Sequence, residues 1–395
     1  MSTTSEGTAV RPFAFEFPES ELDELRQRVR AARWPEKETV SDQSQGTPLA
    51  TIQELARYWA EEYDWRNIEA KLKALPHFVT EIDGLDIHFI HVRSRHENAL
   101  PLIVTHGWPS SVIALLKIVE PLTDPTAHDG DASDAFHLVI PSMPGYGFSG
   151  KPTAPGWNPE RIARAWAELM KRLDYTKYVA QGGDSGAVIT DLMGVQEPEG
   201  LLGIHTNMPG VIPPAIEQAV TAGNPLPSHL QFAKEESAAL EQLGFVYQHV
   251  HYAYMMGSLP QSLTALADSP VGLAAFMLGP GLPLIPEASP EGTDGLTRDD
   301  ILDNITLFWL TNTAISAARL YWENKTPFFG ARGVALPTAV SVFPDELYET
   351  PKSWAEQAYP QLIHYNRLEK GGHFPAWEQP ELFAKEIRTS LRSLR

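Results

Sequence analysis

Apolar residues recur every three or four positions in the first part of the chain and then change to strict alternation. The helical spacing predicts helices over residues 20–33 and 51–63. The runs 78–82 and 87–92 alternate apolar and polar side chains, which is typical of half-buried strands. The Asp83-Gly84 pair between these two runs predicts a tight hairpin turn.

From residue 101 onward, short apolar runs alternate with amphipathic segments. We expect buried strands at 101–105, 137–140, 178–182, 338–343 and 362–365, and helices at 112–119, 161–173 and 382–394, the first of these helices capped by Ser110. Strands and helices in this order predict right-handed βαβ units of a mostly parallel sheet. Ligands of such sheets bind beyond the carboxyl ends of the strands.

The stretch YVAQGGDSGAVI, residues 178–189, combines a strand, a sharp turn and the start of a helix. Gly182 and Gly186 stand two residues on either side of Asp184, and a nucleophile elbow requires such small neighbours. Ser185 has small neighbours at the same distance, so spacing alone leaves a carboxylate and a hydroxyl as alternative nucleophiles. An isolated GDSG string also fits a glycine turn with a capping side chain.

Further candidates follow the ends of other predicted strands. His106 comes directly after the run at 101–105. The acidic pair Asp345 and Glu346 follows the run at 338–343, and His373 lies on a glycine-rich loop after the last strand. The order nucleophile, acid, histidine along the chain is that of an α/β-hydrolase triad. We therefore predict an α/β-hydrolase fold, with either of the two adjacent carboxylates as the acid.

Composition narrows the class of protein. The 395 residues carry a formal net charge of -19, which argues against nucleic acid or an anionic membrane surface as a partner. The chain has no cysteine, so disulfides and cysteine nucleophiles are excluded. The acidic loop 124–134 lacks the frame of an EF-hand, and we expect no metal and no cofactor. Without a signal peptide or an apolar run long enough to span a bilayer, we expect a cytoplasmic protein with no membrane anchor.

Five motifs together resemble the microsomal-type epoxide hydrolase family. They are QGGDSG around Asp184, HGWP at His106–Pro109, PGYGFS at Pro144–Ser149, FPDE at Phe343–Glu346 and GGHF at Gly371–Phe374. RPFAFEFPESELDELRQRVRAARWP and EIDGLDIHFIHVRS resemble the meander that this family wraps around its hydrolase domain, so the match runs from about Val10 to Leu394. The chain departs from the family in two respects: mammalian members carry an N-terminal membrane anchor, and many relatives have Trp where this chain has Ser185.

The resemblance implies a reaction and a role for each matched residue. Asp184 would attack an epoxide carbon and form an alkyl ester. Water activated by His373 would hydrolyse that ester, while Glu346 orients the imidazole. The backbone amides of Trp108 and Ser185 would form the oxyanion hole.

The family frame also implies an acid at the epoxide oxygen and a substrate pocket. Two lid tyrosines would donate to the ring oxygen, and the match assigns Tyr321 and either Tyr252 or Tyr254. The aromatic content of the lid favours a small apolar or aromatic epoxide, with water as the second reactant. Substrate contacts are expected from four side chains: His106, Pro109, Phe148 and Tyr254.

We predict four segments: an N-terminal extension at 1–97, a hydrolase core at 98–210 and 333–395, and a helical lid at 211–332. A haloalkane dehalogenase and a serine esterase on Ser185 are the alternatives. The first commonly needs Trp after the nucleophile, and a serine nucleophile would leave an ether that water does not readily cleave. A non-catalytic binding protein is disfavoured because every triad position is filled. Detoxification and biosynthesis fit the residues equally well, and a homodimer is one option for the oligomeric state.

Overall fold

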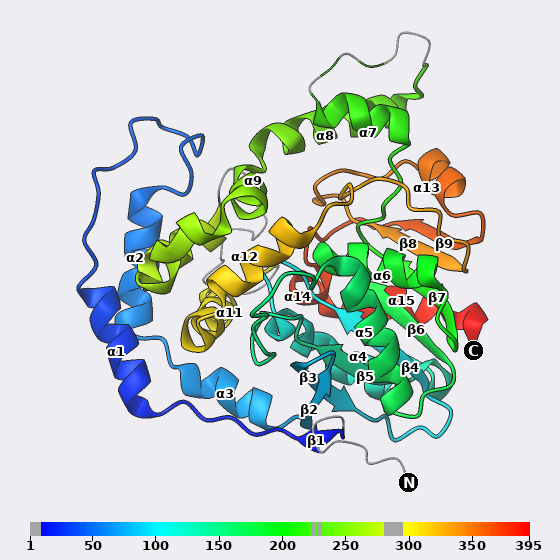
Figure 1. Cartoon of the computed structure of the whole chain (residues 1–395), viewed down its shortest axis with the longest axis horizontal. Coiled ribbons are helices and arrows are strands. Elements are labelled where there is room, and N and C mark those ends of the chain that lie inside the picture. The colour runs from blue at the N-terminus through cyan, green and yellow to red at the C-terminus, as the bar shows by residue number, and fades with distance from the viewer. Residues whose placement is uncertain (1–8, 223, 225, 227–230, 280–294) are drawn as a thin grey trace.

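The computed structural model of the chain describes residues 9–222, 224, 226, 231–279 and 295–395 (Figure 1). In these residues one sheet runs in the order β1-β2-β3-β5-β4-β6-β7-β8-β9. Its strands are Arg11–Pro12 (β1), His77–Ile82 (β2), Leu85–Val92 (β3), Leu100–Thr105 (β4), Phe136–Pro141 (β5), Tyr178–Gly182 (β6), Leu201–Thr206 (β7), Thr338–Val342 (β8) and Leu362–Arg367 (β9). The first three strands and the β3-β5 pair are antiparallel, and all pairs from β5 to β9 are parallel.

Both faces of the parallel part of the sheet are covered. The α-helices are α1 (Glu19–Arg30), α2 (Leu49–Glu61), α3 (Trp65–Lys73), α4 (Val119–Thr123), α5 (Pro159–Arg172), α6 (Ser185–Gln196), α7 (Pro214–Thr221), α8 (Lys234–His249), α9 (His251–Ser258), α10 (Pro270–Leu278), α11 (Arg298–Thr311), α12 (Ala314–Glu323), α13 (Lys352–Ala358), α14 (Pro375–Glu378) and α15 (Pro380–Ser390). In the described part of the chain, no helix is both long and apolar enough to cross a lipid bilayer.

Alternating residues of the central strands feed two hydrophobic cores. In β4, Ile103 packs into the core that contains Ile162 and Trp166 of α5, whereas Leu102 points to the opposite face. There it shares a core with Ile387 of α15. Because successive side chains of a strand point to opposite faces, a strand without polar interruptions must be covered on both sides. This explains why the central strands lack apolar-polar alternation.

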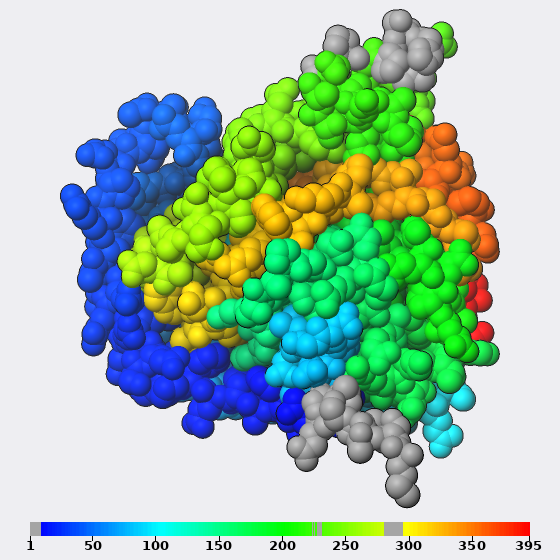
Figure 2. All heavy atoms as spheres, viewed as in Figure 1, coloured from blue at the N-terminus to red at the C-terminus, as the bar shows by residue number. Residues whose placement is uncertain are grey.

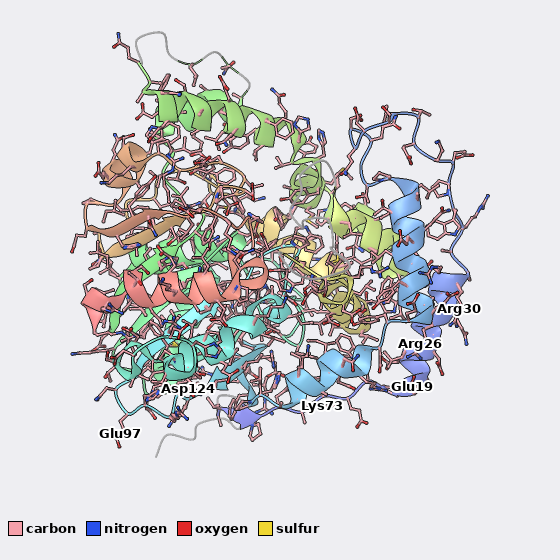
Figure 3. All side chains as sticks on the ribbon, turned by 180° about the vertical axis from the view of Figure 1, so that it is seen from behind. Glu19, Arg26, Arg30, Lys73, Glu97 and Asp124 are labelled. Atoms are coloured by element: carbon pink, nitrogen blue, oxygen red, sulfur yellow. The ribbon has the colours of Figure 1, made fainter. Side chains whose placement is uncertain are left out.

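Helices α7 to α12 lie between β7 and β8 in the chain and form a cap, which we define as residues 211–332. The N-terminal helices α1 to α3 lie along the outer side of this cap (Figures 1 and 2). The outer surface of α1 is charged, where Arg26 binds Glu19 at 2.8 Å (Figure 3). On the inner side, the indole of Trp59 donates to Thr306 of α11 at 3.0 Å. The N-terminal segment therefore holds the cap through buried polar contacts.

One of these contacts makes stability depend on pH. The Tyr63 hydroxyl donates to Oδ1 of Asp303 on α11 at 2.7 Å, and burial raises the pKa of Asp303 to about 7. Because the folded-state pKa lies above the usual 3.8, folding favours the protonated carboxyl, and stability is lost as the pH rises from about 4 through 7. Asp303→Asn keeps the acceptor oxygen and removes the charge.

We therefore expect Asp303→Asn to stabilise the fold by roughly 1–3 kcal/mol at pH 8 and to have little effect at pH 4.5. Urea unfolding of both proteins at the two pH values measures the difference. An equal gain at both pH values would show that the carboxylate charge is not the cause.

Most elements agree with the sequence predictions, including α1, α2, the β2-β3 hairpin and the strands that lead to the candidate site. The expected helix at 112–119 is wrong in two details. Residues Val112–Ile118 form a 3-10 helix (η2), followed by α4. The N-cap residue of this 3-10 helix is Ser111, whose hydroxyl accepts from the Ile113 amide. The Ser110 hydroxyl instead donates to the Gly107 carbonyl at 3.1 Å.

Candidate active site

Asp184 lies on a sharp turn between β6 and α6. Its backbone has φ 51° and ψ -130°, a strained conformation for a residue with a Cβ. A Cβ on Gly182 would lie 2.1 Å from the Gly186 carbonyl oxygen, and a Cβ on Gly186 would lie 2.1 Å from the Thr105 carbonyl oxygen. Both glycines are therefore needed for the close packing that presents the carboxylate. Asp184 is buried at the N-terminus of α6, where the helix dipole stabilises negative charge.

Three buried side chains from three strand ends form a connected chain. His373 Nε2 lies 3.2 Å from Asp184 Oδ2, and its Nδ1 lies 2.5 Å from Glu346 Oε1. The Leu347 amide donates to Glu346 Oε1 at 2.8 Å and fixes that carboxylate. Asp345 takes no part in these contacts, because its backbone pairs with the loop of Gly371 and Gly372. The geometry therefore favours Glu346 over Asp345 as the partner of the histidine.

The two carboxylates control the charge of the imidazole. Burial alone would lower the pKa of His373, but the charge of Glu346 and the hydrogen bonds to Asp184 and Glu346 outweigh it and raise the pKa. His373 is thus an imidazolium between two carboxylates at neutral pH. Removing the charge from either carboxylate would lower the pKa of His373 again.

The loop after β4 holds the other oxygen of Asp184. The Trp108 amide donates to Asp184 Oδ1 at 2.8 Å. This loop, which contains a cis Trp108-Pro109 peptide bond, is bound from the cap: Asn304 of α11 donates to the Pro109 carbonyl at 2.6 Å and accepts from the Ser111 hydroxyl at 2.7 Å. Ser185 begins α6, so its amide has no partner within the helix.

Two cap tyrosines meet above this carboxylate. Tyr252 on α9 is 4% exposed, and its ring lies 6.1 Å from that of Tyr321 on α12. Burial and the charge of Asp184 raise the pKa of both phenols, so both remain hydrogen-bond donors. The Tyr321 hydroxyl has no hydrogen-bond partner among the described residues. Tyr254 is 75% exposed, because two residues along a helix turn the side chain by about 200°.

Two of the four expected substrate contacts lie elsewhere, and a third, His106, lines the pocket that His373 borders. Phe148 packs with Phe13 and Phe15, with ring centroids 5.6 and 4.4 Å away, and belongs to an aromatic cluster under the N-terminal segment. Tyr254 points outward from the cap. His106 is buried, accepts at Nε2 from the Met143 amide at 3.2 Å, and joins two loops. Burial lowers the pKa of His106 to about 4, so it is neutral.

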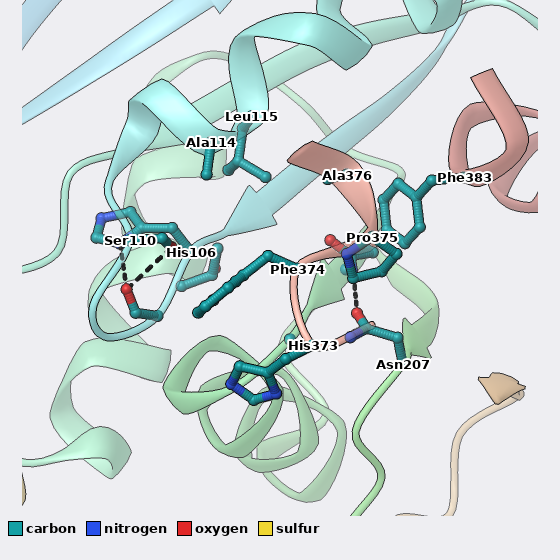
Figure 4. A pocket seen from close by; sticks show the side chains of 14 residues that line it. His106, Ser110, Ala114, Leu115, Asn207, His373, Phe374, Pro375, Ala376 and Phe383 are labelled. Atoms are coloured by element: carbon teal, nitrogen blue, oxygen red, sulfur yellow. Dashed lines mark hydrogen bonds between the residues drawn. The ribbon is translucent and has the colours of Figure 1, made fainter. Parts of the chain in front are cut away.

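A further tyrosine and an asparagine lie beside the site. Tyr146 of the PGYGFS loop is buried against His106 and Phe308, and burial followed by the charge of Asp184 raises its pKa. Asn207, which follows β7, accepts from Gln181 at 3.1 Å and lines the same pocket as His373 (Figure 4). The sequence signal for both was weak, because neither belongs to a catalytic spacing.

In the described ranges, no group of three or more His, Asp or Glu side chains could hold a metal ion. The sheet order, the strand-end positions of the three side chains and their order along the chain define an α/β-hydrolase.

Comparison with known proteins narrows this class. Residues 10–115 match the family model "Epoxide hydrolase N terminus", and residues 101–246 match "alpha/beta hydrolase fold". A Stigmatella aurantiaca protein described as "Putative epoxide hydrolase" is 50% identical over 98% of this chain and 86% of its own length. Epoxide hydrolase 1 of Oryctolagus cuniculus is 33% identical over 97% of this chain and 88% of its own length. The chain belongs to the epoxide hydrolase family.

Solved structures agree with this assignment. Juvenile hormone epoxide hydrolase from the silkworm Bombyx mori superposes with a TM-score of 0.84 at 29% identity, over 98% of this chain and 95% of the other. The epoxide hydrolase of Aspergillus niger superposes with a TM-score of 0.83 at 28% identity, over 98% and 97% of the two chains. The protein is therefore an enzyme that hydrolyses epoxides, as the sequence motifs predicted.

Proposed function

We propose that this epoxide hydrolase works through an alkyl ester on Asp184. The observation that carries the proposal is the different setting of the two carboxylate oxygens. Oδ1 accepts from the Trp108 amide at 2.8 Å, whereas Oδ2 lies 3.2 Å from His373 Nε2. Oδ1 is thus held as the future carbonyl oxygen, and Oδ2 is the oxygen that attacks the epoxide carbon.

In the first half-reaction, a bond forms between Oδ2 and the epoxide carbon while the carbon-oxygen bond of the ring breaks. The ring oxygen gains negative charge and takes a proton from one of the phenols of Tyr252 and Tyr321. Two buried phenol donors whose rings lie 6.1 Å apart would stabilise that charge as it develops. Burial raises the pKa of both phenols, so neither ionises before the substrate binds.

In the second half-reaction, His373 takes a proton from water, and the hydroxide adds to the ester carbonyl carbon. Asp184 is neutral once it is esterified, so the imidazole has lost one of the two carboxylates that raise its pKa. His373 can then release its proton, which neutralises the phenolate left by the first half-reaction, and act as a base. The tetrahedral oxyanion rests on the amides of Trp108 and Ser185. Its collapse breaks the bond between the carbonyl carbon and Oδ2, and the leaving diol oxygen takes the proton that His373 removed from water. The new carboxyl group then gives its proton to His373, which restores the carboxylate and the imidazolium.

The alternatives fit this site less well. Nε2 of His373 contacts Asp184 rather than the Ser185 hydroxyl, which argues against a serine esterase. A dehalogenase needs donors for a leaving halide, whereas this cap supplies two phenols that suit an oxygen.

Trp108 packs against Phe276 and Phe308, which favours a small apolar or aromatic epoxide. We also propose that the protein is cytoplasmic, because a chain without cysteine suits a reducing compartment.

Loss of either phenol tests the ring-opening step. We expect Tyr252→Phe and Tyr321→Phe each to slow ester formation by roughly 10–100-fold, because each removes one donor to the developing alkoxide. Ester hydrolysis should change less. Rapid-quench single turnovers separate the two rate constants. Tyr254→Phe is the matched control, because this exposed phenol lies outside the site. A larger effect in the control than in the other two variants would contradict the assignment.

A further inference from the structure

Glu378 binds the backbone on both sides of His373. It ends the short helix α14 and is only 9% exposed. Its Oε2 accepts from the Gly372 amide at 2.8 Å, and its Oε1 accepts from the Phe374 amide, also at 2.8 Å. The two oxygens of one carboxylate thus hold the residues immediately before and after the histidine.

The loop lies directly on this carboxylate. A Cβ on Gly372 would lie 2.8 Å from Glu378 Oε2, so any larger residue at 372 would displace this carboxylate. Figure 4 shows His373 and Phe374 on the loop that continues into the helix of Ala376, and Glu378 is the last residue of that helix. Hydrogen bonds to a carboxylate are about twice as strong as those between neutral groups. The backbone position of His373 is therefore fixed from within its own loop.

Glu346 and Glu378 hold the histidine in different ways. Glu346 contacts the ring at Nδ1 and fixes its rotation and charge. Glu378 contacts only the neighbouring backbone and fixes the position of the backbone from which the His373 side chain extends. Glu378 also interacts with the charge of His373. Burial raises the pKa of Glu378, and the two amides and the charge of His373 oppose that rise.

We propose that Glu378 is a positioning residue for the hydrolytic half-reaction. Glu378 holds His373 so that Nε2 can take a proton from the water that attacks the ester carbonyl. Ester formation needs the Asp184 carboxylate and the phenols, and depends less on the exact height of the imidazole. This inference rests on the proposed alkyl-enzyme pathway.

Glu378→Gln tests the inference, because it keeps the shape but turns one acceptor oxygen into a donor that faces an amide N–H. We expect ester hydrolysis to slow by roughly 10–100-fold, as for a small misplacement of a catalytic group, with ester formation changed by less than about threefold. The ester then accumulates in the steady state, so kcat and KM fall together and kcat/KM is retained. Rapid-quench single turnovers with styrene oxide and intact-protein mass spectrometry measure both steps.

Glu386→Gln is the matched control. Glu386 is a buried carboxylate on α15 that accepts from Ser341 at 2.9 Å and Asn366 at 3.0 Å and lies 2.7 Å from His364, away from the site. We expect this control to lower the melting temperature without ester accumulation. If Glu378→Gln does not fold, Glu378→Asp provides the same test, because its shorter carboxylate cannot reach both amides.

The outcomes separate the two proposals. Slow hydrolysis with retained ester formation in the Glu378 variant, and not in the Glu386 control, supports the positioning role. An ester in the wild type with the same partition between the two steps in both variants overturns the positioning role alone. A wild type that turns over without any ester overturns the alkyl-enzyme pathway and the inference with it.

Discussion

Asp184→Asn is expected to lower diol formation by at least about 10⁴-fold, which corresponds to about 5.5 kcal/mol of lost transition-state stabilisation. A neutral amide has no oxygen nucleophilic enough to open an epoxide. The amide oxygen can still accept from the Trp108 amide, so the turn before α6 should keep its geometry. The melting temperature should therefore change little. Steady-state diol formation from styrene oxide measures the effect.

The same experiment separates the rival nucleophile. If the Ser185 hydroxyl attacked, Ser185→Ala would abolish turnover and Asp184→Asn would retain most of it. Mass spectrometry of the peptide that carries residue 184 controls for slow deamidation of the asparagine to aspartate. Retained turnover in a protein whose residue 184 is proved to be asparagine would contradict the account.

His373→Gln is expected to stop the enzyme after the first half-reaction. Without a base, ester hydrolysis should slow by roughly 10³-fold or more, while the Asp184 carboxylate can still open the ring. One equivalent of substrate should then remain bound. Intact-protein mass spectrometry should show a mass increase equal to one epoxide, and steady-state turnover should fall to the rate of ester hydrolysis.

Two neighbours serve as controls for this variant. Glu346→Gln removes the charge at Nδ1 and should show a weaker form of the same block, because Glu346 Oε1 lies 2.5 Å from that nitrogen. Asp345→Asn should behave as the wild type, because its side chain is not in the chain of contacts. Rapid turnover without ester accumulation in His373→Gln would contradict the role of this histidine as the base.

Regular side-chain periodicity made most of the fold predictable. The helix of Leu22 and Leu25, the hairpin at Asp83-Gly84 and the strands β4, β5, β6, β8 and β9 follow directly from the pattern. The elements without such a pattern were not predicted. Strand β1 has two residues, β7 is interrupted by Gly203, and α3 is only nine residues long. Their positions depend on pairing and packing with distant segments. The four segment boundaries remain a prediction.

The candidate site was predictable where chemistry and spacing coincide, at Asp184 and His373. The choice between candidate residues that are close in the sequence required the three-dimensional structure. Tyr252 and Tyr254 differ in which face of α9 they occupy, and sequence comparison alone did not resolve that difference. Phe148 was expected at the substrate but packs in the N-terminal aromatic cluster, because aromatic rings in that loop have closer partners there.

Supporting residues were missed for a different reason. Glu378 and Asn304 act on backbone groups, so they follow no catalytic spacing. A carboxylate five residues after His373, among apolar neighbours, was the available signal for the first. Nothing in the local sequence links Asn304 to the Pro109 carbonyl almost two hundred positions earlier.

The central claim, an ester on Asp184, is tested most directly by a single turnover of styrene oxide in oxygen-18 water. In the proposed pathway water attacks the carboxylate carbon, and the alkyl group leaves with Oδ2. The account therefore predicts label in the peptide that carries Asp184 and none in the diol of the first turnover. Label in the diol with an unlabelled Asp184 would mean that water attacks the epoxide directly, and it would contradict the account.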